Sequence, residues 1–98
     1  MILVVGSANL DFVVSASHIP APGETVLGER FQTFPGGKGA NQAVACARAS
    51  GAETHMLLAL GRDDFAKPLT DALSQAGVVQ HTVLSEQPTG CAFICVSS

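Results

Sequence analysis

Two short apolar segments, each followed by a polar turn, constrain the fold of this chain most strongly. Residues 2–5 are all apolar and end at Gly6, and a second apolar segment covers residues 53–61. Short strands that are apolar on both faces are typical of buried parallel sheets. Parallel neighbours need a crossover connection, and such crossovers are right-handed. The pattern therefore predicts an α/β fold whose parallel sheet contains Ile2–Val5 and Thr54–Leu60.

Helix-forming segments stand where such crossovers need them. The alanine-rich segment Ala40–Ala49 predicts one helix, because alanine has the highest helix propensity, and Gly51 suits the left-handed conformation that ends a helix. The segment Ala66–Gln75 predicts a second helix, with Pro68 in its first turn, where proline is tolerated. The alternation of strands and helices supports the α/β class.

The remaining segments predict a helix cap and further strands. Asp63 or Asp64 is the expected N-cap of the second helix, and strands are expected at Val78–Leu84 and Cys91–Ser97. The segment Val13–Phe34 is rich in turn residues, with two prolines and two glycines. We therefore expect Val13–Phe34 to lie outside the parallel sheet, as extended strands that pair with Cys91–Ser97.

Composition excludes several classes of function. Hydrophobic residues make up 47% of the 98 residues, which suits one small domain with a core. The net charge is -3 and no basic run occurs, which argues against nucleic-acid binding. No segment approaches the roughly 20 apolar residues of a membrane span, and the N-terminus lacks the basic start of a signal peptide. We expect a cytoplasmic protein, free cysteines and no metal site among the three scattered histidines.

The glycine-rich segment GGKGAN, residues 36–41, stands at the start of the first expected helix. It is not a Walker A motif, because Gly39 follows Lys38 where serine or threonine is needed. It is not the dinucleotide fingerprint GxGxxG either, because Gln42 occupies the position of the third glycine. The segment is therefore not expected to be either kind of phosphate-binding loop.

Polar groups near this segment favour a small polar ligand. Backbone N–H groups at a helix start lack helical partners, and glycine lets a ligand approach them. Asn41 adds an amide there, and Asn9 and Asp11 follow the first strand. Ligands of open parallel sheets bind at the carboxyl ends of the strands, so we expect Asn9, Asp11 and Asn41 to converge. Amides around one carboxylate suit a sugar. The alternative is that Asn9 and Asp11 form only a turn and the glycines only cap a helix.

Five motifs occur in order along the whole chain: GSANLD at 6–11, PAPGET at 20–25, GGKGANQAVACARASGA at 36–52, LGRDDFA at 60–66 and PTGCAFICV at 88–96. Together they resemble the ribokinase/PfkB family of carbohydrate kinases. The string GGKGANQ is the most specific of them. The resemblance implies that residues 1–98 are the N-terminal portion of one ribokinase-like α/β domain, in which a parallel sheet with flanking helices is accompanied by a β-lid. The lid segments would be about 12–35 and 88–98.

The resemblance also implies an activity. Members of the family transfer the γ-phosphoryl group of ATP to a sugar hydroxyl, with Mg²⁺ and often with K⁺. The ribokinase-like motifs imply D-ribose as the substrate and D-ribose 5-phosphate as the product. They also imply a homodimer formed through the lid.

The resemblance assigns site residues as well. Gly36 and Gly37 would form the lid hinge, and the sugar would be bound by two groups of residues. These are Asn9, Leu10 and Asp11, and Gly37, Lys38, Gly39, Ala40 and Asn41.

No catalytic or metal-binding residue is implied within this chain. The family's second glycine-rich signature, which carries the catalytic base, does not occur up to Ser98. We therefore expect an N-terminal part of a larger domain that is inactive by itself. Two alternatives stay open: a non-catalytic sugar- or nucleotide-binding module, and a structural fragment without function alone.

Overall fold

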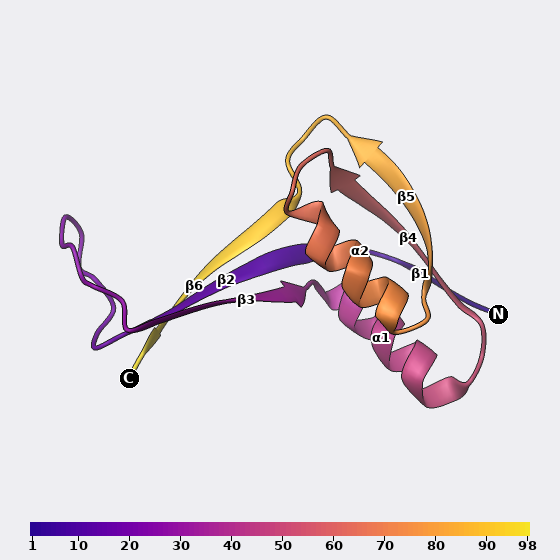
Figure 1. The fold of residues 1–98 in the computed structure, drawn as a ribbon, viewed down its shortest axis with the longest axis horizontal. Helices are drawn as coiled ribbons and strands as arrows, with labels where there is room; N and C mark the ends of the chain where they lie inside the picture. Colours follow the sequence, from indigo (N-terminus) through magenta and orange to yellow (C-terminus); the bar gives the residue numbers. More distant parts are fainter.

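The computed structural model describes residues 1–98 and contains six strands and two helices (Figure 1). In chain order these are β1 (Ile2–Val5), β2 (Asn9–Ala16), β3 (Arg30–Gly36), α1 (Lys38–Ser50), β4 (Thr54–Gly61), α2 (Ala66–Gln75), β5 (Val79–Ser85) and β6 (Gly90–Ser97).

The first sheet is parallel, with the strand order β1-β4-β5. Its register places Val4 beside Met56 and Leu58 beside Thr82. The helices α1 and α2 form the connections that lead into β4 and β5. The predicted α/β class and the predicted parallel strands are confirmed.

The second sheet has the order β3-β2-β6 and extends away from the helices (Figure 1). The strand β2 pairs antiparallel with β3 and parallel with β6. The prediction that Val13–Phe34 lies outside the parallel sheet is thus confirmed. Its predicted pairing with Cys91–Ser97 is confirmed for residues 13–16 only, because β3 pairs with β2 and not with β6. One boundary differs. The second sheet begins at Asn9 and not after Asp11, because Asn9 already pairs with Gly36 and Gly90.

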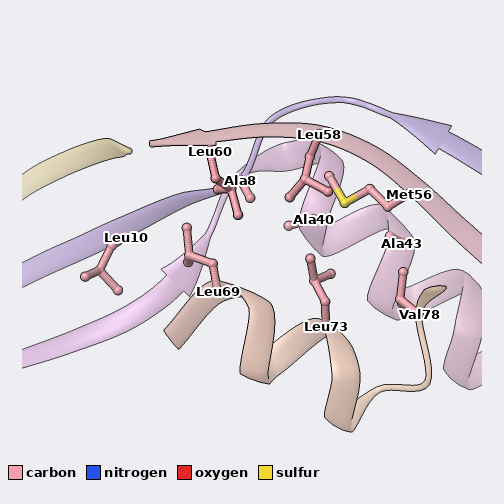
Figure 2. Close-up of a cluster of buried hydrophobic side chains, with 10 residues drawn as sticks. All are labelled: Ala8, Leu10, Ala40, Ala43, Met56, Leu58, Leu60, Leu69, Leu73 and Val78. Carbon is pink, nitrogen blue, oxygen red and sulfur yellow. The ribbon is translucent and has the colours of Figure 1, made fainter. Parts of the chain in front are cut away.

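The core lies between the parallel sheet and the two helices, which pack on the same face (Figure 2). Alternate residues of β4 supply its largest side chains: Met56, Leu58 and Leu60 are buried. Leu69 and Leu73 of α2 complete the layer. Burying one such side chain stabilises the fold by about 1.5–3 kcal/mol.

The opposite face of the parallel sheet carries no helix, as we expect when only two crossovers are present. Leu3, Val5 and Leu57 lie there with 54%, 69% and 38% of their surface exposed. The rings of His55 and His81 stack on this face beside Leu3 and Leu57.

The helix ends agree with the sequence in two respects and differ in one. Gly51 has the left-handed conformation expected at the end of α1, and Pro68 lies in the first turn of α2. The predicted capping of α2 by Asp63 or Asp64 is wrong. Phe65 is the N-cap and no side chain caps the helix, because the Asp63 carboxylate bonds to the backbone of Thr89 instead.

The three cysteines are free and half-buried. Neither helix is long and apolar enough to span a membrane.

Candidate functional site

Asn9 and Asp11 form a polar pair at the start of β2. They lie two residues apart in a strand, so both side chains project from the same face of the sheet. The Asn9 amide donates a hydrogen bond of 2.8 Å from Nδ2 to Oδ1 of Asp11. An ionised carboxylate has about four acceptor positions, and this bond uses one of them. The Asp11 carboxylate is therefore oriented by Asn9 and keeps capacity to accept hydrogen bonds from a ligand.

Gly36 borders the other side of this carboxylate. A Cβ atom at position 36 would lie 2.6 Å from Oδ2 of Asp11, closer than real Cβ contacts come. The absence of a side chain on Gly36 is thus what makes room for the Asp11 carboxylate. Sequence reasoning placed Gly36 at a hinge, and the structure adds that it forms a wall of the site.

Gly37 and Gly39 let the start of α1 pack directly on the connection between β1 and β2. Gly37 has φ of 102°, and a Cβ there would lie 2.6 Å from the Ser7 carbonyl oxygen. A Cβ on Gly39 would lie 2.8 Å from Cα of Gly6. The N–H of Ala40 donates to the Ser7 carbonyl at 3.1 Å. The glycines of this segment therefore serve close backbone packing beside the site.

The start of α1 also offers backbone donors. No side chain caps this helix, and no acidic residue lies in its first turn. First-turn N–H groups have no partner inside a helix. The N–H groups of Ala40 and Asn41 are bonded to the carbonyls of Ser7 and Gly37, so those of Lys38 and Gly39 are left for a ligand. The positive end of the helix dipole favours electron-rich ligand atoms. The site therefore combines a carboxylate acceptor with backbone donors, which is the complement that hydroxyl groups require.

The other predicted site residues occupy different surroundings. Leu10 and Ala40 belong to the core, with 4% and 8% of their surface exposed, so their side chains do not face a ligand. Lys38 is exposed and forms no ion pair. The Asn41 side chain makes no hydrogen bond to Asn9 or Asp11. It lines a cleft of about 240 Å³ between α1 and α2, together with Gly36 and others.

One polar contact near the site was missed by sequence reasoning. Thr89 is 3% exposed, and its Oγ1 accepts a hydrogen bond of 3.0 Å from the Gly61 N–H. Its own N–H donates to Oδ2 of Asp63 at 2.8 Å. Hydrogen bonding from Thr89 holds the pKa of Asp63 below its usual range. The Thr89 hydroxyl has the larger effect and the Thr89 backbone N–H the smaller one. Asp63 and Thr89 lie 26 residues apart, so no local pattern could have paired them.

The structure offers no ligand set for the metals that the resemblance implies. No three side chains of His, Cys, Asp or Glu gather at one point in residues 1–98. Mg²⁺ prefers near-octahedral oxygen ligands, and Asp11 is the one carboxylate placed beside Gly36 and Asn9. These residues do not fit a metal centre.

Comparison with known proteins decides the family. All of residues 1–98 match the profile of the pfkB family carbohydrate kinases. The chain belongs to this family. The resemblance inferred from the five motifs is thereby confirmed.

The similar members of the pfkB family include several ribokinases. The chain is 42% identical over 96 residues to the ribokinase of Haemophilus influenzae, a match that covers 96% of the chain and 31% of that protein. The crystal structure of the Thermotoga maritima ribokinase superposes with a TM-score of 0.91 at 38% identity, over 99% of the chain and 32% of that structure.

A ribokinase of Arabidopsis thaliana, solved in complex with ribose and ATP, superposes with a TM-score of 0.85 at 36% identity. That match covers 99% of the chain and 32% of that structure. The chain therefore spans about a third of the length of these pfkB relatives.

Proposed function

We propose that this chain is the sugar-binding part of an ATP-dependent kinase that converts D-ribose to D-ribose 5-phosphate. The observation that carries the proposal is the Asp11 carboxylate, held by the Asn9 amide and bordered by Gly36 at the start of α1. Membership of the pfkB family supports the class of reaction. The similar ribokinases, one of them solved with ribose and ATP, support ribose as the sugar.

In this proposal Asp11 accepts hydrogen bonds from sugar hydroxyls, and Asn9 holds the carboxylate in place. Backbone N–H groups near Gly37 to Gly39 donate to the sugar, because glycine permits a close approach. Asn41 lies exposed in the first turn of α1 and adds an amide at the rim of the site. A site built to bond hydroxyls rejects molecules that lack them, because its polar groups are then left unpaired.

The second sheet would act as a lid over the sugar. Gly36 and Gly37 connect it to α1, and the φ of 102° at Gly37 is one that L side chains rarely adopt. The rings of Phe12, Phe31 and Phe93 stack on one face of this sheet, where Phe93 is 82% exposed. An exposed apolar patch of this kind suits a protein interface, which supports a homodimer formed through the lid. We place the protein in the cytoplasm, with Mg²⁺ and K⁺ as cofactors of the whole enzyme.

Residues 1–98 alone would not transfer a phosphoryl group. Phosphoryl transfer needs a base near the attacking hydroxyl, donors for the developing charge and a cradle for ATP. Asp11 is the carboxylate placed beside the sugar, and its role is that of an acceptor. The Asp63 carboxylate is bonded to the backbone of Thr89. The contribution of this chain is therefore recognition of the sugar.

The test is Asp11→Ala in the complete enzyme. Loss of a charged hydrogen-bond partner costs roughly 1–3 kcal/mol, so the KM for ribose should rise about 5- to 150-fold. The KM for ATP should stay unchanged, because Asp11 faces the sugar only. Asp11→Asn keeps the shape and some acceptor capacity, so it should fall between the wild type and Asp11→Ala. Coupled ADP release at varied ribose and varied ATP measures both constants.

Two results would contradict the proposal. Equal effects of Asp11→Ala on both KM values would place the residue outside the sugar pocket. Ribose that raises the melting temperature of the wild-type protein without any ADP release would instead support a non-catalytic sugar-binding module.

A further inference from the structure

One row of paired residues lies at the edge of the second sheet that is nearest to α1. Asn9 of β2 lies opposite Gly36 of β3 on one side and opposite Gly90 of β6 on the other. Two of these three residues lack a side chain. A Cβ on Gly90 would lie 3.3 Å from Cβ of Asn9, and Gly36 lies against the carboxylate of Asp11. The backbone positions of β3 and β6 therefore decide directly where Asn9 and Asp11 lie.

The start of β6 is fastened to the end of β4 by the contacts among Gly61, Asp63 and Thr89, here called the Gly61–Asp63–Thr89 bridge. It consists of the bond from the Thr89 N–H to Asp63 and the bond from the Gly61 N–H to the Thr89 hydroxyl. The packing is tight, because a Cβ on Gly61 would lie 2.5 Å from the Thr89 nitrogen. The bridge thus fixes the residue that directly precedes Gly90.

Thr89 is the main partner of the carboxylate in this bridge. Asp63 forms no ion pair, and the backbone N–H groups of Ala66 and Phe65 lower its pKa less than Thr89 does. Hydrogen bonds to an ionised acceptor are stronger than neutral ones. The lowered pKa of Asp63 agrees with a carboxylate that stays ionised in this contact.

We propose that Asp63 is a positioning residue for the sugar site, because it fixes Thr89 and thereby places Gly90 against Asn9 and its partner Asp11. The expected effect of Asp63 on ribose binding rests on the proposed function. The expected effect of Asp63 on the Asn9 side chain rests on the geometry alone. Asp63 does not touch the sugar. It acts through the start of β6.

The first experiment compares Asp63→Ala with Asp64→Ala in the complete enzyme. Asp64 is the adjacent exposed carboxylate and makes no hydrogen bond or ion pair, so it controls for the loss of charge in this loop. Asp63→Ala should raise the KM for ribose about tenfold and leave kcat within about twofold, the pattern of lost ground-state binding. Asp64→Ala should change neither. Equal KM values for the two variants would overturn the proposal.

The second experiment observes the Asn9 side chain without any sugar. The complete enzyme is labelled with ¹⁵N-asparagine, and Asn41, the other asparagine of residues 1–98, serves as the internal reference. The Asn9 amide protons, bonded to Asp11, should exchange slowly with solvent in the wild type and in Asp64→Ala. They should exchange faster in Asp63→Ala, while Asn41 stays the same. An unchanged exchange rate of the Asn9 amide protons in Asp63→Ala would also overturn the proposal.

The two experiments separate failure of this inference from failure of the proposed function. If the wild type does not phosphorylate ribose but Asn9 responds to Asp63→Ala, the proposed function is wrong and the positioning role stands. If Asp63→Ala does not fold, Thr89→Val and Thr89→Ser replace it, because valine lacks the bridging hydroxyl and serine keeps it. Thr89→Ser should then match the wild type in both readouts, and equal values for Thr89→Val and Thr89→Ser would overturn the proposal.

Discussion

Replacing Gly36 by alanine should damage the proposed sugar site while leaving the fold intact. The added Cβ would lie 2.6 Å from Oδ2 and 2.9 Å from Cγ of Asp11. Contacts below 3.0 Å are essentially never seen for real Cβ atoms, so the carboxylate must retreat by about 0.4 Å or more. The carboxylate is the free end of a side chain, which can turn away. Turning strains or breaks the 2.8 Å bond from the Asn9 amide.

The magnitudes separate binding from stability. Gly36 has no positive φ, so alanine fits its backbone conformation, and the stiffer unfolded chain can stabilise the protein by about 0.4–1 kcal/mol. That gain offsets a net loss of about 0.5–1.5 kcal/mol for one hydrogen bond. The folded state should therefore change little. Ribose loses an oriented carboxylate, which at roughly 1–3 kcal/mol means a KM about 5- to 150-fold higher.

The assay is coupled ADP release with varied ribose, alongside thermal unfolding of the same preparations. Gly28→Ala is the matched control. Its φ is not positive, and its new Cβ would lie 2.6 Å from Cγ2 of Val14, a side-chain atom outside the Asn9–Asp11 pair. A Gly36→Ala variant with the wild-type KM for ribose would refute the reasoning. So would a variant that loses more stability than Gly28→Ala and affects both substrates equally.

Two further predictions concern stability. Gly39→Ala should lower the free energy of unfolding measured by chemical denaturation. Overpacking against Gly6 costs about 1–3 kcal/mol, which exceeds the gain of about 0.8–1 kcal/mol in helix propensity. A more stable variant would contradict this prediction. Because the pKa of Asp63 is lowered in the folded state, its bond to Thr89 stabilises the fold fully at a pH above the ordinary aspartate pKa of about 4. This stabilisation is lost as the pH falls through the pKa that Asp63 has in the folded protein. Asp63→Asn should therefore reduce the fall in melting temperature between about pH 5 and pH 3, whereas an unchanged fall would assign acid sensitivity to other groups such as Glu24.

The parallel sheet was predictable from the sequence because its signals are local. The apolar segments that became β1 and β4 are bounded by glycine, and the helix α1 is rich in alanine and ends at a glycine with positive φ. The boundary of the second sheet was less predictable. Asn9 and Asp11 look like turn residues, and their place in β2 depends on pairing with Gly36 and Gly90 far along the chain.

The site shows the same division between local and distant information. Asp11 and the glycine-rich segment belong to recognisable motifs, so the sequence could propose them as site residues. The assignment of Asp63 as a helix cap failed, because a carboxylate before a helix usually bonds the first turn and only the fold brings Thr89 to it. The reason for each glycine was also hidden, since Gly36 and Gly39 are required by atoms of Asp11 and Gly6 rather than by their own φ.

If the second sheet is the lid that we propose, the position of Asp11 in it separates sugar recognition from closure of the lid. If the sheet turns about the row of Asn9, Gly36 and Gly90, each residue moves in proportion to its distance from that row. Asp11 lies two residues away, about 7 Å, whereas Ala16 lies seven residues away, about 23 Å. A rotation that sweeps the end of β2 across the site therefore displaces the carboxylate only about a third as far. Asp11 can keep its bond to Asn9 throughout, so changes near the row should alter sugar affinity and changes near Ala16 should alter access to the site.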